Sequence, residues 1–565
     1  MRFVAYIIAL VVFFAANTSV SAQVPGGAEA GRIEQRFDQP TPPRARPSVT
    51  RGLESTIPPA EAAAFTLVLS NVVIEGSTVY DDATLRGFYA DAIGSKVTLA
   101  KVFDIAAAIT ARYGNDGYIL SRAVVPPQEI DPNGAVIHIR VIEGYVDDVR
   151  WPAGLERYHD FFSSYSAAIM ADVPLNVKTL ERYLLLANDL PGLEFQSNLV
   201  ASDTNPGAST LILSVTEDPF DVFLSADNYG VEASGPYQGT LGGALNNLLG
   251  IHERIEGAFT VAGPSENHHT ELSYASWGYS QVINAEGLLF FHRGNWSDGT
   301  PGTPALLALD YQTAGLNLSA GFSAPFIRSR SENLNGTIAF DFKNSESENL
   351  GVTATEDRLR IVRAELAYEK ADDYGGINQL IATAHKGIDG LGSTENGNPL
   401  ASRNPGVVDF FRVTGEITRT QQLGGRFSLY AAGYGQWTND PLLASQECGY
   451  GGRLYGRGFD SSIITGDRCL FGKVELRHDL RLTGPLATWL TYAQPYAFFD
   501  YGHIANIDAP LGTPTNDEGS SAGLGLRFGN ENFSTDLTVT TVVDAPNSQP
   551  NIDQTRGWFR VTMRF

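Results

Sequence analysis

The chain has 565 residues and a formal net charge of −23, with 58 Gly, 30 Phe and 23 Tyr against 3 Met and 2 Cys. Such an acidic balance argues against nucleic-acid binding, which favours basic surfaces. Glycine and aromatic residues suit the turns and interfacial girdles of a membrane β-barrel, but an acidic, secreted, soluble binding protein would share these numbers. Composition alone therefore leaves both classes open.

Residues 1–22 have the form of a secretory signal peptide. Met1-Arg2 gives a positive start, an apolar run extends from Phe3 to Ala16, and Val20-Ser21-Ala22 is a small-residue cleavage site. An uncleaved membrane anchor is the alternative, although the apolar run is short for one. No later segment reaches about 18 consecutive apolar residues, so the mature chain is expected to have no transmembrane helix. A membrane protein without such helices must be a closed barrel, because every backbone polar group in lipid needs an internal partner.

Residues 23–64 form a segment that we interpret as a linker. They are rich in Pro, Ala, Arg and Glu, and their prolines include Pro40, Pro42, Pro43, Pro47, Pro58 and Pro59. A segment of this composition cannot bury a core. A short N-terminal helix over Gly27–Phe37 agrees with the spacing of Ile33 and Phe37, and a disordered tail is the alternative.

Residues 65–144 and 145–217 are each predicted to form an α+β unit of about 75 residues. The first has candidate strands and helices at Phe65–Ile74, Asp82–Ala92, Leu99–Tyr113, Tyr118–Val125 and Ala135–Glu143. The second has a strand at Tyr145–Val149, a helix at Leu175–Asn188, and strands at Glu194–Ala201 and Thr210–Thr216. The pattern indicates two β-α-α-β-β units in tandem, each compact enough to fold separately.

Residues 218–565 lose the helical period and become short alternating segments separated by turn residues. In Leu334–Lys343, most even positions are apolar and most odd positions are polar. A soluble sandwich would show the same alternation, but roughly sixteen candidate strands far exceed one sandwich domain. Connections also alternate between short, such as Gly250–Glu253, and long, such as Thr438–Leu470. We therefore predict a transmembrane antiparallel β-barrel.

The final strand of this region has a clear two-faced pattern. One face carries Phe559, Val561, Met563 and Phe565, and the other carries Trp558, Arg560, Thr562 and Arg564. An apolar face, a charged face and a terminal aromatic residue suit the closing strand of an outer-membrane barrel. Taken alone, the stretch also fits a half-buried strand of a soluble sheet.

Two short stretches within the predicted barrel point to a family. Leu454–Asp460 contains Arg457, Gly458 and Phe459 in a long connection, and Phe498–Gly502 contains a Phe-x-Asp-x-Gly pattern. Together with the overall organisation, they resemble the two-partner secretion transporters (TpsB family, hemolysin-activation/secretion proteins). The resemblance implies that the two α+β units are POTRA domains and that the barrel has sixteen strands. Gly456 departs from the family motif, which has a β-branched residue there, and we expect this to loosen the loop tip.

The resemblance assigns these stretches a joint role inside the barrel. It implies that the loop carrying Arg457 folds back into the lumen and that Asp500, with Phe498 and Gly502, belongs to the inner-strand motif that receives it. A buried arginine needs a partner, and a carboxylate offers bidentate, charge-assisted hydrogen bonds. Glu475 and Asp479 are competing partners for Arg457, and an exposed arginine in a Gly-rich hairpin is the alternative. Phe565 resembles the terminal aromatic residue that the barrel-assembly machinery recognises.

Cys448 and Cys469 flank the same loop. An exported protein permits a disulfide between them, which would stabilise the loop by roughly 3 kcal/mol in the chain-entropy model. Two free thiols are the alternative.

The sequence offers no support for catalysis or for a bound cofactor. It has no Gly-x-Ser-x-Gly elbow and no His-Glu-x-x-His motif. His268-His269 is only a pair without a surrounding ligand cluster, so we expect no metal and no cofactor.

The expected function is therefore transport rather than catalysis. We expect a Gram-negative outer-membrane protein whose POTRA domains recognise an unfolded secreted partner in the periplasm and whose barrel translocates it. The client would be an adhesin or cytolysin type of exoprotein. Other expected partners are outer-membrane lipid and, during biogenesis, the barrel-assembly machinery; nucleic acid is not expected. A barrel-insertion factor of the same superfamily and a passive porin-like channel are the alternatives.

Overall fold

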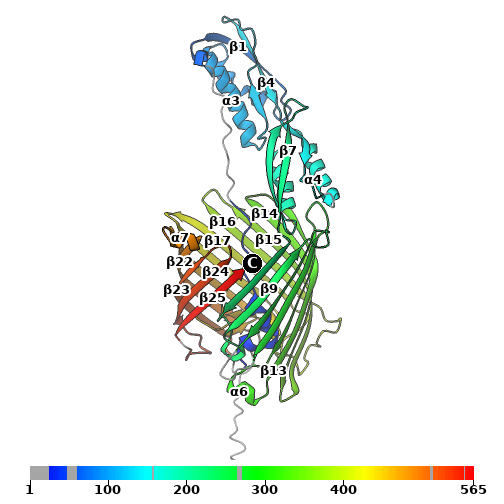
Figure 1. Cartoon of the computed structure of the whole chain (residues 1–565). Helices are drawn as coiled ribbons and strands as arrows, with labels where there is room; N and C mark the ends of the chain where they lie inside the picture. The colour runs from blue at the N-terminus through cyan, green and yellow to red at the C-terminus, as the bar shows by residue number, and fades with distance from the viewer. Residues whose placement is uncertain (1–23, 47–59, 156–157, 264–269, 510–512, 553) are drawn as a thin grey trace, which may run out of the picture.

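Figure 1 shows a β-barrel with two small α+β units extending beyond one of its ends. This computed structural model describes residues 24–46, 60–155, 158–263, 270–509, 513–552 and 554–565. The predicted signal peptide and the pair His268-His269 lie outside the described residues. Within the described residues, no helix is long and apolar enough to cross a bilayer.

The first unit is a four-stranded sheet covered by one long helix. Its elements are β1 (Thr66–Glu75), α2 (Asp82–Arg86), η4 (Ala90–Ala92), β2 (Lys96–Thr98), α3 (Leu99–Asn115), β3 (Arg122–Val124) and β4 (Ala135–Ile142), with the sheet order β2-β1-β4-β3. Alternate residues of β4 point inward onto α3, whose Val102, Ile105 and Ile109 are buried. The Thr98 side chain caps α3 by accepting a hydrogen bond from the Lys101 amide.

Two details of the first unit differ from the sequence prediction. The single helix predicted over Asp82–Ala92 is two short pieces, because α2 ends at Gly87 and η4 follows as one turn of 3-10 helix. Strand β2 was not predicted, since three residues are too few to show an alternating pattern.

The second unit is a three-stranded sheet packed against two helices. Its elements are β5 (Tyr145–Arg150), α4 (His159–Ala171), α5 (Val177–Asn188), β6 (Leu193–Ala201) and β7 (Ala208–Glu217), with the order β5-β7-β6. Helix α4 has no clear signal in the sequence, because it is apolar over much of its circumference and has no side-chain cap at its N-terminus. In contrast, Asn176 caps α5 through the Lys178 amide.

Charged contacts join the second unit to the barrel. Asp189, at the end of α5, accepts two hydrogen bonds from the Arg328 guanidinium at 2.7 and 2.8 Å. Arg182 and Tyr183 of α5 both donate to Glu286 in a turn between barrel strands, at 2.8 and 2.9 Å. Helix α5 therefore faces the barrel rim, and Phe161 at the start of α4 also packs against the rim, on His252.

The barrel consists, within the described residues, of sixteen strands in one closed antiparallel sheet, as predicted. The strands are β8 (Phe220–Asp227), β9 (Gln238–Asn246), β10 (Glu253–Ala262), β11 (Leu272–Val282), β12 (Leu289–Gly299), β13 (Gln312–Arg328), β14 (Glu332–Asn349), β15 (Val352–Ala371), β16 (Gly376–Gly387), β17 (Phe411–Gly424), β18 (Phe427–Thr438), β21 (Arg468–His478), β22 (Tyr492–Ala505), β23 (Asn516–Gly529), β24 (Phe533–Asp544) and β25 (Thr555–Arg564). The ring closes where Arg560–Arg564 of β25 pairs with Phe223–Asp227 of β8.

The closing strand β25 has the two faces that its alternation predicts. Met563 and Phe565 are 47% and 74% exposed on the outer side of the barrel. Trp558 is buried in the interior, and the hydroxyl of Thr562 lies 3.2 Å from that of Ser225 on β8. The interior face therefore contributes polar contacts to the seam while the apolar face covers the outside.

The start of the Pro-rich segment lies inside the barrel. It forms two 3-10 helices, η1 (Gly26–Ala28) and η2 (Ala30–Phe37), and η2 contacts β12, β13 and β14. Ile33 is only 2% exposed and packs with Leu272 and Tyr274, and Phe37 stacks on Tyr274 at 4.0 Å between ring centroids. Residues 38–46 have no regular secondary structure, and the Arg46 amide donates to the Arg330 carbonyl in the turn between β13 and β14.

Glu143 should make the stability of the first unit depend on pH. Burial alone would raise the pKa of its carboxyl, but hydrogen bonds from Thr78 and Tyr113 hold that pKa below its usual range. A carboxylate with a lowered pKa stabilises the fold above its ordinary pKa of about 4.3, and this contribution is lost as the pH falls through the folded value. Glu143→Gln should therefore cost about 1–2 kcal/mol at neutral pH.

In Glu143→Gln, the free energy of unfolding of this unit should also fall less between neutral and acidic pH than in the unsubstituted protein. Hydrogen exchange of the α3 amides between about pH 7 and pH 3 measures both effects. Glu129→Gln, at an exposed site of the same unit, is the control. Equal pH profiles for Glu143→Gln and the unsubstituted protein would contradict this assignment.

Candidate functional site

The long connection between β18 and β21 folds back into the barrel lumen. Near its base, β19 (Cys448–Tyr450) and β20 (Ile464–Gly466) pair as a short hairpin. The hairpin packs against β22, and residues 451–463 form the tip of the loop. Arg457, Gly458 and Phe459 lie at this tip and are all buried.

Arg457 lies against Asp500 of β22 in a bidentate arrangement. Its Nε and Nη2 donate to the two carboxylate oxygens at 2.8 and 2.6 Å, and its backbone amide donates to one of them at 3.0 Å. Asp500 has no exposed surface, and the Arg457 side chain is only 6% exposed. Three charge-assisted hydrogen bonds between the same two residues therefore fix both the side chain and the backbone of the tip.

Glu475 of β21 is a second acidic partner of Arg457, at 2.6 Å from Nη1. It also accepts hydrogen bonds from Arg477 and Arg527, at 2.8 and 3.1 Å. Asp479, the other expected competitor, instead accepts a hydrogen bond from Gln494 just beyond the end of β21. The lumen wall thus offers Arg457 two carboxylates, and surrounding arginines balance their charge.

Aromatic and glycine residues complete the seat of the loop tip. The Phe498 ring lies under the Arg457 guanidinium at 3.6 Å, in cation–π geometry. Phe459 is fully buried beside Tyr450, whose ring occupies the space where Gly502 would carry a side chain. Phe498 and Gly502 of the Phe-x-Asp-x-Gly pattern therefore both contact the loop. The Phe498 ring contacts Arg457, and Gly502 leaves room for the Tyr450 ring.

Gly456 has a structural reason to be glycine. Its backbone φ is +83°, a conformation that β-branched residues strongly disfavour, and a Cβ would lie 2.8 Å from the Tyr450 ring. The backbone around it is also held, because the Gly458 amide donates to Ser521 and the Trp558 indole donates to the Arg457 carbonyl. The expected loosening of the tip is therefore not what these contacts indicate.

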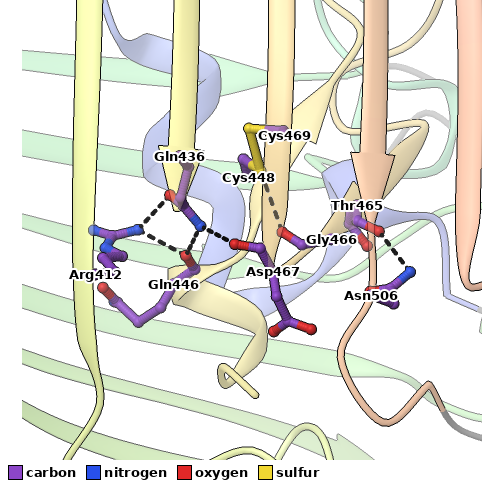
Figure 2. Close-up of a disulfide and its surroundings, with 9 residues drawn as sticks. All are labelled: Arg412, Gln436, Gln446, Cys448, Thr465, Gly466, Asp467, Cys469 and Asn506. Carbon is purple, nitrogen blue, oxygen red and sulfur yellow. Dashed lines mark hydrogen bonds between the residues drawn. A yellow bond between two sulfur atoms is a disulfide. The ribbon is translucent and has the colours of Figure 1, made fainter. Parts of the chain in front are cut away.

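A disulfide joins Cys448 of the loop to Cys469 of β21 (Figure 2). Beside it, the Gln436 amide of β18 donates to the carbonyls of Gln446 and Asp467, both at 3.0 Å. Gln446 lies just before the hairpin of the loop, and Asp467 lies just before β21, where the chain returns to the barrel wall. Both ends of the loop are therefore attached to the wall, by one covalent bond and by one shared side chain.

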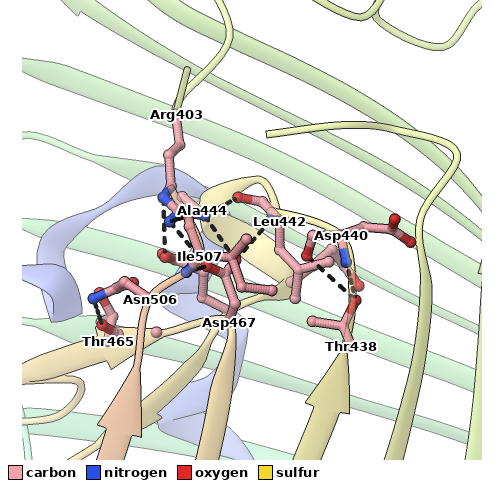
Figure 3. Close-up of polar contacts among 12 residues, drawn as sticks. Arg403, Thr438, Asp440, Leu442, Ala444, Thr465, Asp467, Asn506 and Ile507 are labelled. Atoms are coloured by element: carbon pink, nitrogen blue, oxygen red, sulfur yellow. Dashed lines mark hydrogen bonds and ion pairs between the residues drawn. The ribbon is translucent and has the colours of Figure 1, made fainter. Parts of the chain in front are cut away.

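Asp467 is the centre of a second cluster, which was not predicted from the sequence (Figure 3). Its carboxylate is fully buried and accepts hydrogen bonds from the Arg403 guanidinium at 2.7 and 2.9 Å. It also accepts hydrogen bonds from the backbone amides of Leu442 and Ile507, each at 2.7 Å. One carboxylate thus joins three separate connections, and no local sequence signal marks it.

The N-terminal segment is attached to the same loop and to the wall. Arg32 of η2 forms ion pairs with Glu29 and with Glu447, the residue that precedes Cys448. Glu34 of η2 pairs with Lys343 of β14. A cavity of about 760 Å³ remains in the lumen beside η2, and charged side chains from both the segment and the wall line it. Within the described residues, no group of His, Cys, Asp and Glu is placed to hold a metal ion.

Two α+β units precede a barrel whose lumen holds its own loop and N-terminal segment. This architecture defines the class, an outer-membrane transporter with periplasmic domains. The chain belongs to the family described as haemolysin secretion/activation protein ShlB/FhaC/HecB, which matches residues 207–528. The description POTRA domain, ShlB-type, matches residues 67–144. The family comprises the transporters of two-partner secretion, which are not enzymes, so the barrel lies in the outer membrane and the POTRA domains lie in the periplasm.

Individual relatives are similar over most of their length. The heme/hemopexin transporter protein HuxB of Haemophilus influenzae (strain 86-028NP) is 23% identical over 84% of this chain and 82% of its own. The outer membrane transporter CdiB-2 of Burkholderia pseudomallei (strain 1026b) is 24% identical over 85% and 80%. The solved structure of CdiB from Escherichia coli has a TM-score of 0.70 at 19% identity, covering 94% of this chain and 96% of that one. This last likeness shows the shared fold.

Replacing both cysteines by serine should weaken the loop without unfolding the barrel. The bridge joins residues 21 positions apart, and the chain-entropy model gives about 3 kcal/mol for such a loop. We expect Cys448→Ser/Cys469→Ser to unfold at lower temperature than the unsubstituted protein, as seen by the gel shift of folded against unfolded barrel. Peptide mapping without reductant should recover the two cysteines as one linked pair. Two alkylatable thiols in the native protein would contradict the bridge.

Proposed function

We propose that this protein exports an exoprotein of adhesin or cytolysin type, which its POTRA domains bind in unfolded form. The observation that carries this proposal is a lumen occupied by two segments whose contacts include buried and partly buried ion pairs, from Arg32 and Glu34 in one segment and from Arg457 in the other. A segment bound through ion pairs can exchange them for water or for another chain, whereas an apolar plug would expose its apolar surface on leaving. The proposed domain limits are residues 65–144 and 145–217 for the POTRA domains and 218–565 for the barrel.

The proposed client-binding surface is on the second POTRA domain. Strand β6 lies at the edge of its sheet and pairs, among the described residues, only with β7. An edge strand can bind an extended chain through main-chain hydrogen bonds with little demand on the client's sequence. Exposed residues along β6, including Gln196, Ser197 and Asn198, leave this edge accessible. Helix α5 forms the adjoining wall, since Asn188 accepts a hydrogen bond from the Phe195 amide at 2.7 Å.

We further propose that Arg457, Gly458 and Phe459 act as a latch and that Phe498, Asp500 and Gly502 receive it. In support, the guanidinium bridges two neighbouring strands, β21 and β22, through Glu475 and Asp500. The disulfide restricts how far the latch can move from the wall. Phe565 is proposed as the signal for the barrel-assembly machinery, because it is exposed at the end of the closing strand.

Two other functions fit parts of the chain less well. A passive porin needs neither the POTRA domains nor a lumen closed by charged segments. A barrel-insertion factor shares the architecture, and the number of its clients distinguishes it from a secretion transporter. The transporter proposed here is expected to have one exported client, whereas an insertion factor is expected to have many outer-membrane barrels as clients.

A strain that lacks this protein tests the function. We expect one large exoprotein to remain in the periplasm while other outer-membrane barrels keep their normal levels. Expression of Arg457→Ala should restore barrel insertion but only a small part of secretion, because Asp500 and Glu475 lose a buried partner. Arg358→Ala, which removes an exposed and ion-paired arginine, is the control and should restore secretion fully. General depletion of outer-membrane barrels would instead establish the insertion function.

Photo-cross-linking tests the proposed client-binding edge. A photoreactive residue in place of Asn198 on β6 should cross-link to the client during secretion, because the edge pairs with the client backbone. The same residue in place of Arg86, exposed on α2 of the first POTRA domain, is the control and should cross-link far less. Equal yields at the two positions would place client binding elsewhere.

A further inference from the structure

The outer face of the barrel has an apolar groove across β13 to β17. Its volume is about 580 Å³, within the range of roughly 300–1,000 Å³ that small-molecule sites occupy. Alanine and glycine form its floor, at Ala324, Gly336, Ala364, Ala382 and Ala384. The groove therefore opens toward the hydrocarbon of the membrane rather than toward water.

The strand register explains why a groove forms here. One row across neighbouring strands reads Phe322, Ile338, Ala364, Ala384, Val413, with bulky residues at its ends and alanines between them. Ile338 and Phe322 are 66% and 50% exposed, so they stand out from the surface as one wall. The low centre and raised edge are therefore built into the sheet and do not depend on one flexible side chain.

Phe326 forms the wall at the periplasmic end of β13. It is 63% exposed, and its ring lies over Gly336, where a Cβ would meet ring carbon Cε2 at 2.5 Å. Glycine at this position lets the ring lie against the sheet, so the ring closes the groove on this side. The groove thus extends across neighbouring strands, with Ala364, Ala382 and Ala384 at its centre, and its surface is almost entirely apolar, as an acyl chain requires.

A row of polar residues lies beyond this end of the groove. The register places Glu332, Lys370, Asn378 and Arg419 side by side on the same outer face. Asn378 is four positions from Ala382 along β16, which is about 13 Å at the usual rise of a strand. The row lies next to the short turns between β13 and β14, between β15 and β16 and between β17 and β18. Figure 1 shows that β14, β15 and β16 reach the end of the barrel from which the POTRA domains extend.

The charges of this row are accessible and nearly balanced. Lys370 pairs with Glu332 at 3.5 Å and Arg419 pairs with Asp372 at 2.6 Å, and the two cationic side chains are 49% and 37% exposed. Exposed cations of this kind can still donate to a phosphate, and the neighbouring carboxylates can accept from an ammonium group. A zwitterionic headgroup therefore matches the row better than a purely anionic one.

We propose that this groove and polar row bind one zwitterionic glycerophospholipid of the periplasmic leaflet. One acyl chain lies in the groove, the phosphate contacts Lys370 and Arg419, and the ammonium contacts Glu332 and Asp372. Because an acyl chain gains little by moving from bulk lipid to protein, selectivity comes from the fit to the groove and from the headgroup contacts. The site faces away from the lumen and is independent of the transport function proposed above.

Native mass spectrometry of the full-length protein tests the site, after transfer into detergent from bilayers of phosphatidylethanolamine with a minor share of phosphatidylglycerol. The unsubstituted protein should retain one phosphatidylethanolamine per chain. Ala382→Phe fills the groove floor and should lower this retention about tenfold. Lys370→Gln should lower it several-fold and leave the groove intact.

Ala522→Phe provides the matched control for the filled groove. It makes the same substitution at an outward-facing position of β23, which pairs with the outward Phe499, and retention should be unchanged. The gel shift of folded barrel establishes that each variant has folded. Equal retention in Ala382→Phe and Ala522→Phe, retention of phosphatidylglycerol instead, or a mass showing a second barrel on this face would each overturn the proposal.

Discussion

A buried guanidinium must be paired, and in this barrel the pairing of Arg457 sets the arrangement of the lumen. Its partners Asp500 and Glu475 lie on neighbouring strands, so the loop tip can be seated only against this part of the wall. Separating such a pair leaves uncompensated buried charge, which costs about 3–5 kcal/mol. The positions of the hairpin, the disulfide and the aromatic residues around Phe459 are all consistent with that requirement.

The same loop also connects the other parts that close the lumen. Glu447 near its start pairs with Arg32 of the N-terminal segment, and Asp467 at its end binds Arg403 of a separate connection. Buried ionic clusters of this kind are rarely the most stable solution, and well-packed apolar residues often do better. Their advantage in a channel is that the partners remain compatible with water when the contacts separate.

Periodicity predicted the large elements well, and it failed where contacts across the structure decide the local conformation. The alternation of β25 and the helical spacing of α3 are properties of neighbouring residues, so the sequence reveals them. Helix α4 does not stand out in the sequence because it is apolar on most sides. The spacing of Ile33 and Phe37 did indicate a helix, which the structure has as the 3-10 helix η2, but not its place inside the barrel. The Arg457 and Asp500 motifs were recognised through family resemblance, whereas Asp467 and Glu447 acquire partners only when distant connections meet.

The seam between β8 and β25 has a consequence for the order in which the protein can fold. Ser225 and Thr562, which meet across it, are 337 positions apart, so this pairing has a far longer sequence separation than any hairpin in the barrel. The pairing of the first barrel strand with the last cannot form until the last strand has been synthesised, so the incomplete sheet has two unpaired edges until then. Such edges invite aggregation, and closing a loop of this length is slow. The nascent barrel thus depends on being kept apart from other chains until its final residues arrive.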